Sequence, residues 1–219
     1  MKTKTKYWIG ALFLIAFVLW TILLRFVDVR AIGPQGSRVG FGMLNESIHK
    51  LTGVHLFLYE LTDWLGLVPF GIAFTFCVLG LVQWIKRKRL WAVDRDILAL
   101  GVFYIVVMAV YAFFESVVIN YRPVLIDGIL EASYPSSTTM LAMCVMPTAM
   151  MQLRARIKNV TIRRCVVLLL LTFTAFMVVG RILSGVHWIT DIIGGALFST
   201  GLICIYGTYV KTKQTIEKA

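Results

Sequence analysis

Three short polar clusters interrupt a sequence that is otherwise strongly apolar. They are Glu115–Pro123, with the sequence E-S-V-V-I-N-Y-R-P, Tyr134–Thr139, with Y-P-S-S-T-T, and Gly180–Asp191, with G-R-I-L-S-G-V-H-W-I-T-D. Each contains side chains that can bind an anion or move a proton. Ionisable groups are costly to place in apolar surroundings, so their concentration in these clusters indicates a functional site.

Several of these residues suit the binding of a phosphoryl group. Arg122 and Arg181 can each form bidentate hydrogen bonds with a tetrahedral oxyanion. A helix that begins near Ser136 would add its free backbone N–H groups, together with the hydroxyl groups of Ser136, Ser137, Thr138 and Thr139. The sequence therefore predicts an oxyanion site built from two guanidinium groups and a group of hydroxyls, which together come from all three clusters.

His187 and Asp191 provide a reactive pair for such a site. They are four residues apart, so on a helix they share a face and the carboxylate can hold the imidazole N–H. A histidine oriented in this way, facing two arginines, is the arrangement required for nucleophilic attack on phosphorus. Each piece has an ordinary explanation on its own, as an interfacial arginine, a helix cap or a self-satisfied ion pair. Their convergence favours a function.

The elements that must position these residues are membrane-spanning helices. Hydrophobic residues make up 59% of the 219-residue sequence and charged residues 15%, whereas a soluble domain has about a quarter of its residues charged. A water-soluble enzyme is therefore excluded. Apolar stretches of about 18 residues or more can cross a bilayer as helices, and the candidates are Tyr7–Leu24, Trp64–Ile85, Ile97–Phe114, Ala132–Leu153, Cys165–Gly180 and Ile192–Val210.

The predicted fold is an all-α, polytopic membrane protein with six transmembrane helices in one bundle, forming a single domain over residues 1–219. The fourth helix is expected to start near Ser136, after its polar beginning. The fifth is short and is expected to extend by a turn at either end. The clusters that carry the chemistry then lie at one end of the third to sixth helices.

The distribution of basic residues predicts the orientation of this bundle. Of the 22 lysines and arginines, most flank the chain ends, including Lys2 and Lys218, or follow the second and fourth spans. The exceptions are Arg25, Arg30, Arg38, Lys50, Arg122 and Arg181. Because loops rich in Lys and Arg stay in the cytoplasm, both termini are expected inside and the polar clusters outside. The net charge of +11 is explained by this topology, so no nucleic-acid partner is expected, and the compact loops indicate a bacterial cell membrane.

The segment Gly40–Asp63 is too polar to span. Leucine and isoleucine residues, together with one histidine, recur in it at intervals of three or four, which predicts a single amphipathic helix lying at the outer membrane interface; the positions are Leu44, Ile48, Leu51, His55 and Leu58. His49 and His55 lie on this segment and are expected to be bystanders.

No metal or cofactor site is expected. The four cysteines lie in apolar stretches, without C-x-x-C spacing and without a neighbouring group of histidines; they are Cys77, Cys144, Cys165 and Cys204. We expect them to pack as small apolar residues.

Taken together, the three clusters resemble the signature of the type 2 phosphatidic acid phosphatase family, membrane lipid phosphatases related in fold to vanadium haloperoxidases. The family pattern is Lys, six residues, Arg-Pro; then Pro-Ser-Gly-His; then Ser-Arg, five residues, His, three residues, Asp. The matching positions are Arg122, Pro123, Pro135, Ser136, Arg181, His187 and Asp191. The departures are Glu115 in place of Lys, Ser137 in place of Gly, Thr138 in place of His and Gly180 in place of Ser.

The resemblance implies a role for each matching residue. His187 would attack phosphorus and carry a phosphohistidine intermediate, while Asp191 would fix its tautomer. The two arginines and the region Ser136–Thr138 would bind the phosphoryl oxygens and stabilise the charge of the transition state. No metal would be required. The substrate, a lipid phosphate, would enter laterally from the outer leaflet.

The departures affect two of these roles. Glu115 would repel phosphate where the family Lys binds it, and on a continuous helix it would lie about 10 Å from Arg122. Thr138 cannot replace a histidine as general acid, and losing a general acid typically costs about 10²–10⁴-fold in rate. The substrate is then a lipid diphosphate with a good leaving group, or a protonated Glu115 is the donor, or the protein binds lipid phosphates without turnover. We favour an active phosphatase or phosphotransferase.

A small membrane transporter is the alternative from a different class. The sequence contains no internal repeat and no acidic residue near the middle of a span where a coupling ion would bind. The sequence does not identify the lipid head group, the lipid tail or the oligomeric state.

Overall fold

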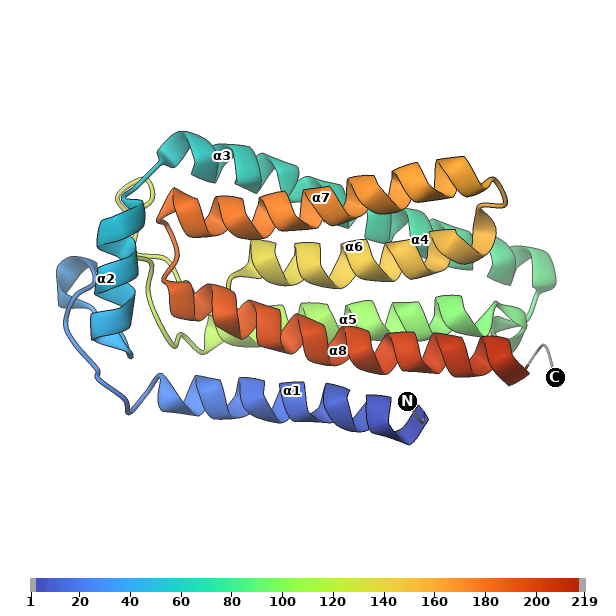
Figure 1. The fold of residues 1–219 in the computed structure, drawn as a ribbon, viewed down its shortest axis with the longest axis horizontal. Coiled ribbons are helices and arrows are strands. Elements are labelled where there is room, and N and C mark those ends of the chain that lie inside the picture. Colours follow the sequence, from blue (N-terminus) through green and yellow to red (C-terminus); the bar gives the residue numbers. More distant parts are fainter. Residues whose placement is uncertain (1–2, 217–219) are drawn as a thin grey trace.

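The computed structural model describes residues 3–216 and shows a bundle of long helices that run side by side (Figure 1). The long helices are α1 (Thr3–Leu23), α4 (Leu67–Arg87), α5 (Arg95–Ser116), α6 (Ser137–Arg156), α7 (Val160–Ser184) and α8 (Ile189–Ile216). Two shorter helices, α2 (Gly42–Thr52) and α3 (Leu56–Leu65), and two 3₁₀ turns, Pro34–Gly36 and Leu90–Ala92, complete them. No strand is assigned within these residues, so the fold is all-α.

Five helical stretches of the described chain are long and apolar enough to cross a membrane. They are Lys4–Leu23, Leu56–Arg87, Arg95–Ser116, Val160–Ser184 and Ile189–Thr212. The protein is therefore a multi-pass membrane bundle. The fifth predicted span does extend at both ends, as α7. Helix α1 begins and helix α8 ends at the same end of the bundle (Figure 1); Lys2 and Lys218 lie outside the described residues.

The fourth predicted span, α6, begins at Ser137 as expected, but it does not meet the same apolar criterion. It lies between α7 and α8 (Figure 1) and is buried along most of its length. Its polar side chains contact protein rather than lipid: Thr148 Oγ1 lies 3.1 Å from the hydroxyl of Tyr104, and Gln152 donates to the hydroxyl of Tyr206. A helix enclosed by other helices can therefore be less apolar than its neighbours.

The prediction of one amphipathic helix over Gly40–Asp63 is wrong. The chain forms α2, which lies across one end of the bundle (Figure 1), and then α3, which packs on α7 and leads directly into α4. The break is at Gly53, which has a φ of 68°. Leu44 and Leu51 are exposed on α2, whereas Asn45 is buried and donates to Thr190 Oγ1. Hydrophobic spacing alone does not reveal the left-handed glycine that divides the segment.

The turn between α7 and α8 is packed closely against this break. Gly185, which ends α7, has a φ of 65°, and a Cβ atom there would lie 1.8 Å from the carbonyl oxygen of Gly53. The N–H of His55 also donates to the carbonyl of Ser184 over 3.0 Å. Only glycine fits this approach, and it fixes the backbone that leads into His187.

Helix α1 covers α8 through another close contact. A Cβ atom at Gly201 would lie 3.1 Å from the carbonyl oxygen of Gly10. Near the site end, Trp20 Nε1 donates to the carbonyl of Thr190 and the hydroxyl of Thr21 lies 2.6 Å from that of Tyr134. The first helix thus supports the start of α8 and the segment just before α6, which carry two of the three polar clusters.

Candidate active site

The three polar clusters meet at one end of the bundle. Arg122, Ser137 and His187, one residue from each cluster, line a single small cavity. The guanidinium groups of Arg122 and Arg181 lie over the same Tyr59 ring, 5.4 Å and 5.0 Å from its centre. The structure therefore brings together the predicted histidine and both predicted arginines.

His187 is buried, with 6% of its surface exposed, and lies in the turn just before α8. Its Nδ1 atom lies 3.0 Å from Ser133 Oγ and 3.1 Å from the carbonyl oxygen of Ser133. Nε2 is also buried and has no hydrogen-bond partner among the described residues. With the proton on Nδ1, the lone pair of Nε2 is available for attack.

Asp191 is fully buried in the first turn of α8. Its Oδ1 accepts from Asn120 Nδ2 over 3.0 Å, and its Oδ2 accepts from the Ser133 hydroxyl over 2.5 Å and from the Trp188 N–H over 3.0 Å. The distance from Oδ2 to His187 Nδ1 is 3.9 Å. The direct hydrogen bond expected from helical spacing is not formed, because His187 precedes the helix and Ser133 lies between the two side chains.

Each arginine is paired with one carboxylate. Arg122 Nε lies 3.0 Å from Glu131 Oε2, and Arg181 Nη2 lies 3.3 Å from Asp63 Oδ1. Arg181 also donates to Thr62 Oγ1 and to the carbonyl of Tyr59. Arg122 Nη1 and Arg181 Nε nevertheless stay buried without a hydrogen-bond partner in the described chain. Because buried donors are rarely left unpaired, these N–H groups are suited to an anionic ligand.

The hydroxyl residues at the start of α6 divide into different roles. Ser136 is the N-cap: its Oγ accepts from the N–H of Thr139 and donates to Thr139 Oγ1 over 3.1 Å. Thr138 is buried and is not among the residues that line the cavity. Of the predicted hydroxyl ligands, Ser137 is the one whose side chain lines the cavity.

Glu115 lines the same cavity as Arg122 and His187. Its carboxyl group interacts with the Tyr111 phenol, one helical turn earlier on α5. The expected separation along a continuous helix does not apply, because α5 ends at Ser116 and Arg122 lies in the following loop, from which it lines the same cavity. Glu115 is therefore placed where it can exchange a proton with a ligand in the cavity.

Sequence reasoning missed the residues that support these groups: Tyr59, Asp63, Asn120, Glu131 and Ser133. Asn120 lies inside the first polar cluster and Ser133 lies beside the second, so their positions in the sequence could have marked them as site residues. Tyr59 and Asp63 lie in the segment interpreted as an interfacial helix. Nothing in their spacing indicated that α3 would pack against Arg181. No group of histidine, cysteine and carboxylate side chains that could hold a metal occurs in the described part of the chain.

Comparison with known proteins gives two matches. The family model described as the PAP2 superfamily matches residues 70–215. Among solved structures, the fold is similar to the crystal structure of a transmembrane PAP2-type phosphatidylglycerolphosphate phosphatase from Bacillus subtilis. That similarity has a TM-score of 0.55 and 20% sequence identity, and it covers 94% of this chain and 96% of the other. No match was found among curated proteins.

Proposed function

The chain belongs to the PAP2 superfamily, and from this we propose that it is a membrane lipid phosphatase that releases phosphate from a lipid phosphate or a polyprenyl diphosphate through a phosphohistidine intermediate. The observation that carries the proposal is the position of His187. His187 lines a cavity together with Arg122 and Glu115, and its Nε2 atom and the buried guanidinium N–H groups nearby have no hydrogen-bond partner among the described residues.

In the first step, Nε2 of His187 forms a bond to phosphorus while the bond from phosphorus to the leaving oxygen breaks. Arg122 and Arg181 bind the phosphoryl oxygens, and their charge is worth most in the transition state, when negative charge on these oxygens is spread and water is excluded. The carboxyl group of Glu115 gives a proton to the leaving oxygen. Water then attacks phosphorus, Glu115 regains a proton from it, and phosphate leaves with the lone pair returned to Nε2.

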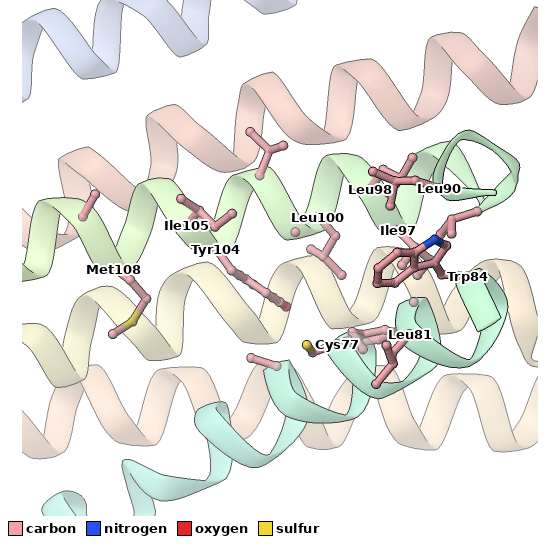
Figure 2. Close-up of a pocket in the computed structure, with 17 residues that line it drawn as sticks. Cys77, Leu81, Trp84, Leu90, Ile97, Leu98, Leu100, Tyr104, Ile105 and Met108 are labelled. Carbon is pink, nitrogen blue, oxygen red and sulfur yellow. The ribbon is translucent and has the colours of Figure 1, made fainter. Parts of the chain in front are cut away.

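The route of the lipid chain is supported by an apolar groove along α4 and α5 (Figure 2), with a volume of about 870 Å³. The side chains of Cys77, Tyr104 and Met108 line it. A second groove shares these three residues and extends to Pro69 and Leu141, close in sequence to Tyr111 and Met140 of the site cavity. We propose that the substrate enters from the side, within the outer leaflet, and that both termini are cytoplasmic.

The substrate panel is the direct test of the proposal. Purified protein in lipid nanodiscs is given phosphatidic acid, phosphatidylglycerolphosphate and a polyprenyl diphosphate, and released phosphate is measured. The fold neighbour is a phosphatidylglycerolphosphate phosphatase, which makes that lipid a reasonable member of the panel. Release from at least one lipid supports the proposal. Tight binding of these lipids with no release from any of them would identify a lipid-phosphate binding protein instead.

Replacement of Glu115 tests the proton donor. Glu115→Gln is expected to slow hydrolysis of a lipid monophosphate by about 10²–10⁴-fold, because an alkoxide leaving group needs the proton. The loss with a diphosphate should be far smaller, since phosphate leaves readily without it. Glu115→Lys should bind phosphate more tightly but show the same loss of monophosphate turnover. Glu46→Gln, which changes a partly exposed carboxylate paired with Lys50 on α2, is the matched control. Equal losses for both substrates would contradict this role.

The protonation of His187 predicts the acid limb of the pH profile. Burial, followed by the nearby charges of Arg181 and Arg122, holds the pKa of His187 well below its usual value of 6.5. The neutral imidazole is the nucleophile, so activity is present above this pKa and is lost as the pH falls through it. We expect kcat/KM, which reports the free enzyme, to fall only well below pH 6.5, after correction for substrate ionisation measured by phosphorus NMR. A midpoint at or above pH 6.5 would contradict the prediction.

A further inference from the structure

We propose that Ser133 is a positioning residue that couples the carboxylate of Asp191 to His187, so that the two act through a serine hydroxyl rather than through a direct hydrogen bond. The inference rests on the proposed function, because it assigns Ser133 a role within that reaction. It is carried by the way three buried side chains, from the loop after α5 and from the start of α8, meet within a few ångströms.

The distances exclude a direct contact between histidine and carboxylate. Asp191 Oδ2 lies 3.9 Å from His187 Nδ1, which is beyond the length of a hydrogen bond. Ser133 Oγ lies 3.0 Å from this nitrogen and 2.5 Å from this oxygen. The hydroxyl is therefore the shortest polar connection between the two groups.

The direction of the hydrogen bonds follows from the chemistry of the groups. An ionised carboxylate only accepts, and Asp191 accepts from Asn120, Trp188 and Ser133. The Ser133 hydroxyl thus donates to Asp191, and its oxygen is left to accept the Nδ1–H of His187. The carbonyl of Ser133 accepts the same N–H over 3.1 Å. Both acceptors hold the proton on Nδ1 and keep Nε2 free.

Buried surroundings make this arrangement hard to replace with water. Ser133 is 3% exposed and Asn120 1% exposed. The two residues are joined by a backbone hydrogen bond of 2.9 Å from the N–H of Ser133 to the carbonyl of Asn120. The loop after α5 therefore holds both donors to Asp191 at a fixed spacing. Polar connections of this kind are strong in a low-dielectric interior.

The expected role is confined to the chemical step. When Nε2 bonds to phosphorus the imidazole becomes cationic, and the polarised serine hydroxyl transmits the stabilising charge of Asp191 to it. Without the hydroxyl, the carbonyl of Ser133 still holds Nδ1–H, so the ring stays oriented and the arginines still bind the substrate. The loss should therefore fall on kcat and leave KM nearly unchanged.

The test compares Ser133→Ala, Ser133→Thr and the control Ser199→Ala in nanodiscs. Ser199 is also fully buried, but its hydroxyl bonds the carbonyl of Met140 inside the bundle. Ser133→Ala is expected to lower kcat by about 10²-fold with KM and orthovanadate binding retained. Ser133→Thr, which keeps a hydroxyl, should recover most of the rate, and Ser199→Ala should match the wild type. Wild-type kcat in Ser133→Ala would overturn the inference.

A double-mutant cycle separates the relay from a merely structural effect. If Asp191 acts through Ser133, adding Asp191→Asn to Ser133→Ala should cost little more than either change alone, whereas independent roles would multiply. A loss of rate in the double variant equal to the product of the two single losses would overturn the inference. If Ser133→Ala does not fold, Ser133→Cys, with a weak donor of similar size, replaces it in the cycle. Failure of the proposed function is distinguishable, because the wild-type protein would then release no phosphate and His187→Ala would change nothing.

Discussion

His187→Ala is expected to abolish phosphate release, by about 10⁴-fold or more, because the substitution removes the atom that bonds to phosphorus. Binding should survive, since Arg122 and Arg181 are held by contacts with Glu131, Asp63 and Thr62 that do not involve the imidazole. The measurement is phosphate release together with the affinity for orthovanadate. His55→Ala, at an exposed position at the start of α3, is the matched control and should leave the rate unchanged.

The stability of the trapped phosphoryl-enzyme towards acid tests whether the phosphoryl group is bound to nitrogen. Rapid quenching of the wild-type protein with labelled substrate should trap a phosphorus–nitrogen bond that is labile in acid and absent from His187→Ala. A variant that keeps normal turnover without His187 would remove the basis for a phosphohistidine route. Retained lipid flux with no phosphate release in either protein would instead favour the transporter interpretation.

Arg181→Ala is expected to lower kcat/KM by about 10³–10⁵-fold, the range measured when a guanidinium that neutralises a transferring phosphoryl group is removed. Arg181 is 1% exposed, and its Nε atom is buried without a hydrogen-bond partner in the described residues. Its ion-pair partner Asp63 is half exposed, so the substitution does not leave a carboxylate buried and unpaired. The protein should therefore fold, which thermal unfolding in detergent can check.

The matched control for this substitution is Arg30→Ala. Arg30 is an exposed arginine in the segment between α1 and α2, where it is paired with Asp28, and it is not among the residues that line the cavity. It should behave as the wild type in every assay. Arg181→Lys should rescue little, because an ammonium group cannot keep the contacts with Tyr59, Thr62 and Asp63 and also present the Nε–H. Full activity in Arg181→Lys would show that charge alone is needed there.

The residues with the most restrictive chemistry were predictable from the sequence. Arg122, Arg181 and His187 are charged or titratable groups in an apolar chain, and their presence there needs an explanation that composition does not supply. Ser133 was not predictable in the same way. A serine near a helix start is ordinary, and its role depends on a 3.9 Å gap between His187 and Asp191 that helical spacing does not foresee.

The helices follow the same division. Apolar composition predicted the helices on the outside of the bundle, because side chains that face the lipid of a bilayer must be apolar. It was a poor guide to α6, whose surroundings are other helices. It also failed for α2 and α3, where a single glycine with positive φ decides whether an apolar period continues. Positions at which the environment is protein rather than lipid are the ones that composition cannot describe.

The part of the chain that precedes residue 70 has a consequence for comparing members of the superfamily. The family model begins at residue 70, yet Tyr59, Thr62 and Asp63 hold Arg181, and Trp20 and Thr21 brace the start of α8 and Tyr134. The stretch that matches the family model, residues 70–215, therefore depends on contacts from residues that precede it. In a chimera that joins residues 70–215 to the leading helices of a relative, His187 and Arg181 would come from one parent, and the residues that hold the Arg181 guanidinium would come from the other.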